Sequence, residues 1–416
     1  MGCSCCSTRC WLIAGSVTGA VLCLLGVILI LVGNTVIEDT VKKEAVLGEG
    51  TTAYETWTST GTPIYRQFWL FDVQNPNDVT NGSIPKLVQR GPYTYRTRYI
   101  PKQNISFSEN HTVSFLLPAG AVFEPSLSVG SEEDTVTSIN LAVAYNNTFD
   151  GPYNVFTGKD DITRVAYIDN WRGQPTMSFW NNTYCDMING TDGSSFPPFL
   201  DKERPLYFFS SDICRSVYGE YESNQDLKGI TVYRYALPDS TFASPTVNPD
   251  NQCFCTNYEA TKNCTMAGVL DTKVCTGSPV FISLPHFLHG SSDLLEAVHG
   301  LKPDAEEHST FLDVEPITGF TLRFAKRLQV NMMYGPSKDI KILQQIKQNT
   351  MFPILWLNET AALDDKTADR LKSALFGRMQ MLEVVQISLI VVGAVLFVLC
   401  LIGICVQKSR SRKIIA

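Results

Sequence analysis

The chain has 416 residues, of which 44% are hydrophobic and 18% are charged, and its formal net charge is −7. Its basic residues form no aromatic-interleaved cluster, which argues against a nucleic-acid-binding protein, so we expect no nucleic-acid partner. Length and composition alone fit one large or two medium soluble domains, but the distribution of apolar residues points elsewhere.

The first element is an uncharged run over residues 11–33. As a helix it would be about 34 Å long at roughly 1.5 Å per residue, enough to cross a bilayer. A cleaved signal peptide is the alternative, but its apolar core would be shorter and would end in a turn. This run instead continues at helical spacing through Ile37, Val41 and Ala45. We therefore predict an uncleaved transmembrane helix after a short tail, residues 1–10.

"GSVTG" places Gly15 and Gly19 on one face of this helix, the small-xxx-small pattern of close helix packing. A domain tethered at both ends brings its two terminal helices side by side, so we expect the glycines at such a contact. A homo-oligomer formed through Gly15 and Gly19 is the alternative use of the same face.

Residues 51–337 show mostly the pattern of short strands between turns. Alternation is strict over residues 93–99 and recurs over 229–237 and 319–330. Turn sequences such as NPND and NPDN separate the runs, and helical segments such as 291–300 are few. We predict a mainly β fold with some α: one large antiparallel domain tethered by a transmembrane helix at each end.

A second uncharged run covers residues 387–406 and is followed by a basic tail, residues 407–416, typical of a cytosolic flank. Two spans return both termini to the cytosol and leave residues 34–386 outside it. A helical stripe is predicted to lead into the second span: Leu371, Leu375, Met379 and Leu382.

Eight Asn-x-Ser/Thr sequons lie between the two apolar runs, and neither tail contains one. A single sequon is weak evidence, but eight in one compartment indicate a glycosylated loop outside the cytosol. The predicted acceptors are Asn81, Asn104, Asn110, Asn146, Asn181, Asn189, Asn263 and Asn358.

The topology divides the 13 cysteines into two chemical populations. Cysteines at the cytosolic boundary do not keep disulfides, and their position suits S-palmitoylation, with unmodified thiols as the alternative. We do not predict myristoylation of Gly2, because Cys6 stands where that motif needs Ser or Thr. The terminal set comprises Cys3, Cys5, Cys6, Cys10 and Cys405, with Cys400 and Cys23 inside the spans.

Six cysteines lie in the loop, where an oxidising compartment favours three disulfides among 15 possible pairings. A zinc site is the alternative, but a sequon contains one of these cysteines and no histidine falls in the cluster. The six are Cys185, Cys214, Cys253, Cys255, Cys264 and Cys275.

Motifs of catalysis and metal binding are missing from the sequence. No Gly-x-Ser-x-Gly elbow, Walker loop or dinucleotide fingerprint occurs. His286 and His289 could share a helix face but lack a nearby third ligand, and Glu306–His308 is not an HExxH motif. We therefore predict no enzyme, no catalytic residue, no metal and no cofactor.

Long stretches of the chain resemble the class B scavenger receptor family, and most closely its fatty-acid translocase branch. The resemblance runs essentially from end to end. It rests on YRQFWLFDVQNP (65–76), QRGPYTYR (89–96), GAVFEPSLSVG (120–130), CDMINGTDGSSFPPF (185–199), FFSSDICRS (208–216), FASPTVNPDNQCFC (242–255), DVEPITGFTLRFAKRLQVN (313–331) and PILWLNET (353–360).

The resemblance implies a β-barrel-like ectodomain with an interior lipid-conducting tunnel and a helical membrane-distal cap. It implies palmitoylation at Cys3, Cys10 and Cys405, to which Cys5 and Cys6 are additional candidates. It also implies the disulfide pairs Cys185–Cys253, Cys214–Cys275 and Cys255–Cys264.

By the same resemblance, the protein binds long-chain fatty acids, oxidised lipoproteins and phospholipids, and thrombospondin-type proteins, and it facilitates fatty-acid uptake. The implied locations are the plasma membrane with its lipid rafts and caveolae, and the Golgi. A sibling branch sorts proteins to lysosomes, but its acidic dileucine signal is absent, because Ile414–Ile415 follows basic residues.

The chain departs from the family pattern where Ala144 passes directly to Tyr145. The family has a largely helical stretch of several tens of residues there, which forms much of the cap and carries its basic lipid contact. We therefore assign no ligand-binding residue. The loop that makes acidic contacts with thrombospondin in the family has few acidic residues here, since Glu109 is the only one. An adhesion and signalling receptor with impaired lipid capture is thus the alternative function.

Overall fold

The computed structural model describes residues 8–58, 62–97, 101–118, 120–139, 149–373 and 377–415. The chain forms two compact units, one made of both terminal segments, residues 1–43 and 365–416, and one made of residues 44–364. Several predicted features lie outside the described residues: Cys3, Cys5, Cys6, Asn146 and the junction between Ala144 and Tyr145.

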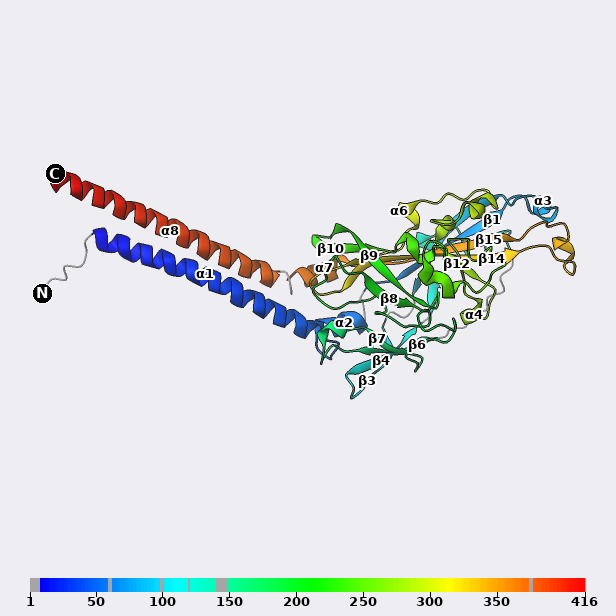
Figure 1. Ribbon diagram of the computed structural model, residues 1–416, viewed down its shortest axis with the longest axis horizontal. Helices are drawn as coiled ribbons and strands as arrows, with labels where there is room; N and C mark the ends of the chain where they lie inside the picture. The colour runs from blue at the N-terminus through cyan, green and yellow to red at the C-terminus, as the bar shows by residue number, and fades with distance from the viewer. Residues whose placement is uncertain are drawn as a thin grey trace. The chain divides into compact units, whose positions relative to one another are not determined.

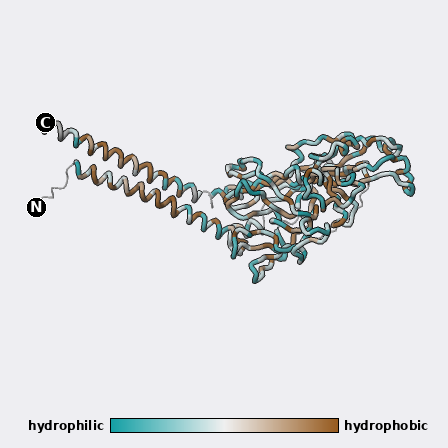
Figure 2. Tube along the Cα trace, in the orientation of Figure 1, coloured by the Kyte–Doolittle hydropathy of each residue, from teal (hydrophilic) through white to brown (hydrophobic). Residues whose placement is uncertain are grey.

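The terminal unit is helical. It contains α1 (Thr8–Ala45), α7 (Asp365–Leu371) and α8 (Gly377–Ile415), and α1 and α8 run side by side (Figure 1). Both long helices are apolar along most of their length (Figure 2), and Thr8–Ala45 and Gln380–Ser409 are long and apolar enough to cross a membrane. The predicted stripe from Leu371 to Leu382 is not tested, because residues 374–376 lie outside the described residues.

Glycines bring α1 and α8 into close contact. A Cβ atom added to Gly19 would lie 2.7 Å from the Gly393 carbonyl oxygen, and one added to Gly15 would lie 2.5 Å from Cys400 Sγ. Both glycines therefore face the second helix of the same chain, which is the packing that the sequence predicts. A homo-oligomer through Gly15 and Gly19 stays a prediction and would compete with this contact.

A buried glutamine also joins the two helices. Gln386, one residue before the predicted second span, donates a hydrogen bond of 2.8 Å from Nε2 to the Leu29 carbonyl oxygen. Gly33 gives it room, because a Cβ atom there would lie 2.6 Å from Gln386 Nε2. Such a bond between apolar helices contributes about 1 kcal/mol.

The second unit is built on two antiparallel sheets. The large sheet has 11 strands in the order β5-β2-β1-β15-β14-β13-β10-β9-β8, with β12 pairing both β11 and β14. Its strands are β1 (Tyr65–Val73), β2 (Leu87–Thr97), β5 (Ala121–Phe123), β8 (Leu206–Ser210), β9 (Arg215–Leu227), β10 (Ile230–Ala236), β11 (Leu270–Asp271), β12 (Phe281–Ser283), β13 (Phe311–Val314), β14 (Thr321–Tyr334) and β15 (Thr350–Ala362).

The small sheet has the order β3-β4-β6-β7. Its strands are β3 (Gln103–Phe107), β4 (Thr112–Pro118), β6 (Phe149–Phe156) and β7 (Ile168–Trp171). The helices of this unit are short, and several are single turns: α2 (Thr52–Thr58), α3 (Pro76–Thr80), α4 (Lys273–Thr276), α5 (Ser292–Glu296) and α6 (Ala305–His308).

The predicted antiparallel β domain is confirmed, and its large sheet is not closed into a barrel. Within the described residues no pairing joins the two ends of the large sheet, β5 and β8. The physical reason lies in the two edge strands of the large sheet, β5 and β8. The strand β5 has only three residues, and Phe208 of β8 forms a bridge with Thr191 instead.

Local sequence explains the longest pairings. The hairpin β9–β10 turns at Lys228 and Gly229, which both have positive φ, the conformation that a two-residue turn between right-twisted strands requires. The pair β14–β15 extends from Arg323 opposite Ala362 to Tyr334 opposite Thr350. It places the alternating segment of the sequence at the centre of the sheet.

Three disulfides tie the loops beside β8 and β9: Cys185–Cys253, Cys214–Cys275 and Cys255–Cys264. These are the pairs that the family resemblance implies. Two of them close loops of more than 60 residues, which limits the freedom of the unfolded chain most.

The sequon asparagines differ in exposure. Asn189 and Asn358 are half-buried, and Asn358 Nδ2 donates to Gln67 Oε1 at 3.1 Å in the middle of the large sheet. We therefore expect Asn358 to be the least accessible acceptor of those described. The exposed acceptors are Asn81, Asn104, Asn110, Asn181 and Asn263.

Candidate functional site

A row of charges crosses the large sheet on one face. In register, Arg66 of β1 lies opposite Glu359 of β15, and Glu359 lies opposite Lys326 of β14. Directly paired residues of antiparallel strands project from the same face, so these three side chains form one row. Arg66 Nε donates to Glu359 Oε2 at 2.6 Å.

Apolar rows run beside the charges on the same face. Residues two positions along a strand share a face, which places Phe68, Leu357 and Leu328 in the next row. A third row follows: Leu70, Leu355 and Val330. Most of these side chains are half-buried. We call these three rows together the amphipathic face.

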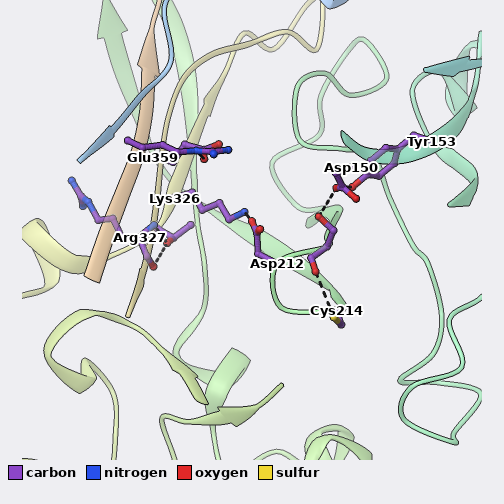
Figure 3. A network of polar contacts seen from close by, with 10 residues as sticks. Asp150, Tyr153, Asp212, Cys214, Lys326, Arg327 and Glu359 are labelled. Carbon is purple, nitrogen blue, oxygen red and sulfur yellow. Dashed lines mark hydrogen bonds and ion pairs between the residues drawn. The ribbon is translucent and has the colours of Figure 1, made fainter. Parts of the chain in front are cut away.

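The strand β14 presents different residues on its other face. Lys326 and Arg327 point to opposite sides of β14 (Figure 3). Arg323, on the side of Arg327, is paired with Asp313 of β13, which also binds Arg234 of β10. A side chain's position in the alternation therefore decides which of the two environments it enters.

Lys326 makes an ion pair with Asp212, in the turn between β8 and β9. Burial lowers the pKa of Lys326, but Asp212 and Glu359 outweigh it and raise that pKa overall. Lys326 in turn is the main cause of the lowered pKa of Asp212. Both groups are therefore charged at neutral pH, although their side chains remain 28% and 61% exposed.

A polar chain continues from this turn to the small sheet (Figure 3). Ser211, next to Asp212, donates to Asp150 Oδ2 at 2.7 Å, and the Tyr153 hydroxyl donates to the same oxygen at 2.5 Å. Burial is the main cause that raises the pKa of Tyr153 well above its usual value, and the negative charge of Asp150 raises it further. Asp150 therefore links β6 to the turn that holds Asp212.

The amphipathic face suits the binding of an amphiphile. Its cations, Arg66 and Lys326, can bind a carboxylate or phosphate, while the apolar rows can cover a hydrocarbon chain. Nothing in this row resembles a nucleophile activated by a base. The ion pair of Lys326 is accessible, so a ligand anion can compete with Asp212 for it.

Sequence reasoning assigned no residue of this face. The signal was present in the alternation over residues 319–330, but pairing with β1 and β15 was needed to join Arg66, Glu359 and Lys326. The partner Asp212 comes from a turn more than 100 residues away in sequence. Such contacts have no local signature.

The histidines singled out from the sequence do not share a helix face, which corrects that expectation. His286 has positive φ and stacks on His308 with ring centroids 4.5 Å apart, while His289 Nε2 lies 3.1 Å from Asp239 Oδ1. Burial lowers the pKa of both His286 and His308 to about 4. Among the described residues no group of three or more His, Cys, Asp or Glu could hold a metal.

The described cysteines of the two long helices form no disulfide. Cys10, near the start of α1, and Cys405, ten residues before the end of α8, are exposed, while Cys23 and Cys400 are half-buried. Palmitoylation of Cys10 and Cys405 stays a prediction.

Comparison with known proteins identifies the family. The model of the CD36 family matches residues 17–145 and 141–404. The chain belongs to the CD36 family. It is thus a member of the class B scavenger receptor family that the sequence resembles.

Two relatives illustrate the similarity. Lysosome membrane protein 2 of Rattus norvegicus is 32% identical over 405 positions, which cover 82% of this chain and 83% of the relative. Scavenger receptor class B member 1 of Mus musculus is 29% identical over 463 positions, which cover 95% of this chain and 89% of the relative. These relatives are named as membrane protein and receptor, and the two apolar helices fit a membrane protein with both termini cytosolic.

The match to the family is split at one place. Its two stretches overlap at residues 141–145, where Ala144 passes directly to Tyr145. The alignment with the mouse receptor also runs over more positions than this chain has residues, so the relative carries residues that this chain lacks. Both findings agree with a missing segment at this junction.

Proposed function

We propose that this protein is a cell-surface scavenger receptor that binds long-chain fatty acids and oxidised lipoproteins and facilitates fatty-acid uptake. Membership of the CD36 family supports a scavenger receptor role. The amphipathic face supports lipids as the ligands, because it places Arg66 and Lys326 beside two half-buried apolar rows.

In this proposal the fatty-acid carboxylate binds Lys326 in place of Asp212, and the acyl chain lies along Phe68, Leu357 and Leu70. Each methylene removed from water contributes about 0.8 kcal/mol, so a few covered carbons balance the loss of an exposed ion pair. Transfer to the bilayer then needs no covalent chemistry.

Uptake by cells that express the full chain tests the proposal. Surface expression is measured first by antibody staining of intact cells, which also distinguishes a plasma-membrane receptor from a lysosomal one. We expect uptake of labelled oleate and oxidised lipoprotein above that of vector controls. Uptake equal to the control, at verified surface expression, would refute the proposal.

A topology with both termini cytosolic and acyl chains on Cys3, Cys10 and Cys405 belongs to the same proposal. An epitope placed before Met1 should stay inaccessible to an impermeant antibody on intact cells. Labelling of that epitope would refute both the topology and the palmitoylation.

A second candidate function is an adhesion and signalling receptor whose lipid capture is impaired. The split of the family match at residues 141–145 favours it, because the cap is expected there. Binding of thrombospondin-type repeats without lipid uptake would support this function over the first.

A further inference from the structure

A short polar segment before β13 contacts two buried histidine rings. We call this segment, residues 302–309, the strap, and its residues 302–307 are exposed. His308 belongs to the strap, and its buried ring stacks on the buried ring of His286 with centroids 4.5 Å apart. Because residues 302–307 are exposed, polar contacts rather than apolar packing fix the position of most of the strap.

Both histidine rings accept a backbone N–H of the strap. The Lys302 N–H donates to His286 Nδ1 at 3.0 Å, and the Asp304 N–H donates to His308 Nδ1 at 2.9 Å. A ring nitrogen accepts a hydrogen bond only while it carries no proton, and a protonated imidazole has two donors and no acceptor. These two bonds therefore exist only while each ring is neutral and carries its proton on Nε2.

His286 is fixed to the large sheet independently of the strap. Its backbone N–H donates to Gln329 Oε1 of β14 at 2.7 Å. Its Nε2 lies 2.7 Å from Gln89 Oε1 of β2, an oxygen that also accepts from Trp356 Nε1 of β15 at 2.8 Å. Because Nδ1 of this ring is an acceptor, Nε2 is the donor to Gln89. Three strands therefore hold the ring in place, and the strap is the part that can leave it.

The surroundings of the two rings oppose their protonation. Burial lowers the pKa of His286 to about 4, and the neighbouring His308 lowers it as well. Burial also lowers the pKa of His308 to about 4, where Asp304 raises it and Arg327 lowers it. Nη1 of that arginine donates to two carbonyl oxygens of the strap at 2.9 and 2.8 Å. A cation therefore stays beside His308 as long as the strap is in place.

We propose that the strap opens in acid, because protonation of His286 and His308 breaks both of its N–H···N bonds while the large sheet stays folded. Each protonated Nδ1 would direct an N–H at the backbone N–H that it now accepts. The two stacked rings would also carry like charges 4.5 Å apart. Opening lets both rings reach water and uncovers Trp356, which is 4% exposed and lies 5.4 Å from the His308 ring between centroids.

The size of the acid response follows from linkage. With the strap closed both rings titrate near pH 4, and in an open, hydrated strap they titrate near about pH 6.5. The open form therefore binds more protons between these values, and the ratio of open to closed strap rises as the pH falls. Between pH 7 and about pH 4.5 the ratio should rise more than about tenfold for each histidine. This inference does not depend on the proposed function.

Hydrogen exchange of the purified full chain in detergent, followed by mass spectrometry, tests the inference. Peptides over residues 301–310 and 321–334 report on the strap and on β14 at pH 7 and about pH 4.5, with each rate divided by the intrinsic rate at that pH. We expect strap protection to fall about a hundredfold, while β14 stays far more protected than the strap. Unchanged strap protection, or equal protection of both peptides in acid, would overturn the proposal.

Variants separate the histidines from the carboxylates of the strap. His308→Asn offers an amide oxygen in place of Nδ1 and does not titrate, so the acid response should fall to about tenfold. His299→Asn, at an exposed position, is the matched control and should keep the full response. Asp304→Asn keeps the oxygen that accepts the Glu307 N–H and should also keep it. A full response in His308→Asn, or its loss in Asp304→Asn, would overturn the proposal.

Discussion

The charged side chains on the two faces of β14 differ in how they are paired and how deeply the pairs are buried. On one face Asp313 is completely buried and binds Arg234 through two hydrogen bonds of 2.7 and 2.9 Å and Arg323 through another. On the other face Lys326 and Asp212 form a single pair, in which Asp212 is exposed and Lys326 is half-buried. The same strand therefore carries a closed charge cluster and an open one.

Buried polar groups accompany the closed cluster. Gln329 and Asn331, on the side of Arg323, are fully buried and bond to one another and to Ser283 Oγ. A satisfied network of this kind is costly to disturb. Charges that remain exposed contribute little to stability and can change partners. We infer that the first face holds the sheet together and that the amphipathic face is available to ligands.

Among the single substitutions, Asp313→Asn should produce the largest loss of stability. The two arginines would keep their charges but lose the carboxylate between them, which costs about 3–5 kcal/mol for a buried pair. Chemical denaturation of the purified chain measures it. Asp201→Asn is the control, because Asp201 pairs with Arg204 at an exposed site and should change stability by less than about 0.5 kcal/mol. Equal losses in both variants would contradict the comparison.

Acid should also lower the stability of the fold, through two buried histidines on the first face. The Nδ1 atoms of His286 and His308 accept backbone N–H bonds from Lys302 and Asp304, so both rings are held neutral. Burial lowers their pKa to about 4, against about 6.5 in the unfolded chain. The unfolded state therefore binds more protons between these values. Stability should fall as pH drops from 6.5 to 4, on the order of 3 kcal/mol for each histidine.

Unfolding curves at several pH values measure this loss. His308→Gln should show a smaller loss over the same pH range, because one titrating ring is removed. His299→Gln, at an exposed position, is the control and should follow the unmodified chain. A pH response in His308→Gln as steep as that of the unmodified chain would exclude this histidine as a cause.

Leu357→Ser should affect stability less and ligand binding more. Leu357 is half-buried in the middle of the first apolar row. We expect a loss of about 1 kcal/mol in stability and a several-fold weaker affinity for oleate, measured by displacement of a fluorescent fatty acid. Val88→Ser, at an exposed position on β2, serves as the control. Unchanged affinity would exclude this row as the acyl-chain site.

Lys326→Gln should give the smallest change in stability, below about 1 kcal/mol, because its pair with Asp212 is accessible. Its effect should appear in oleate affinity and uptake, which we expect to fall several-fold. Lys341→Gln removes an exposed lysine without touching the amphipathic face and should bind as the unmodified chain does. Methyl oleate, which lacks the charge, should bind both variants equally.

Features with a local signature were predictable from the sequence. The two apolar runs became α1 and α8, the alternating segment 319–330 became part of β14, and the glycines at 15 and 19 packed against a helix. Each depends on residues within one or two turns or strands. The open edge of the large sheet was not predictable, because strand pairing between distant segments decides it.

By itself the sequence determined the two apolar helices, the antiparallel β character and the family, since length, period and motif are properties of neighbouring residues. Only the tertiary structure decided that Lys326 meets Asp212 and that Arg66 and Glu359 join their row. The physical reason is that charge pairing and burial depend on which distant strands come together. Alternation along a strand gives two faces, and pairing decides what each face contacts.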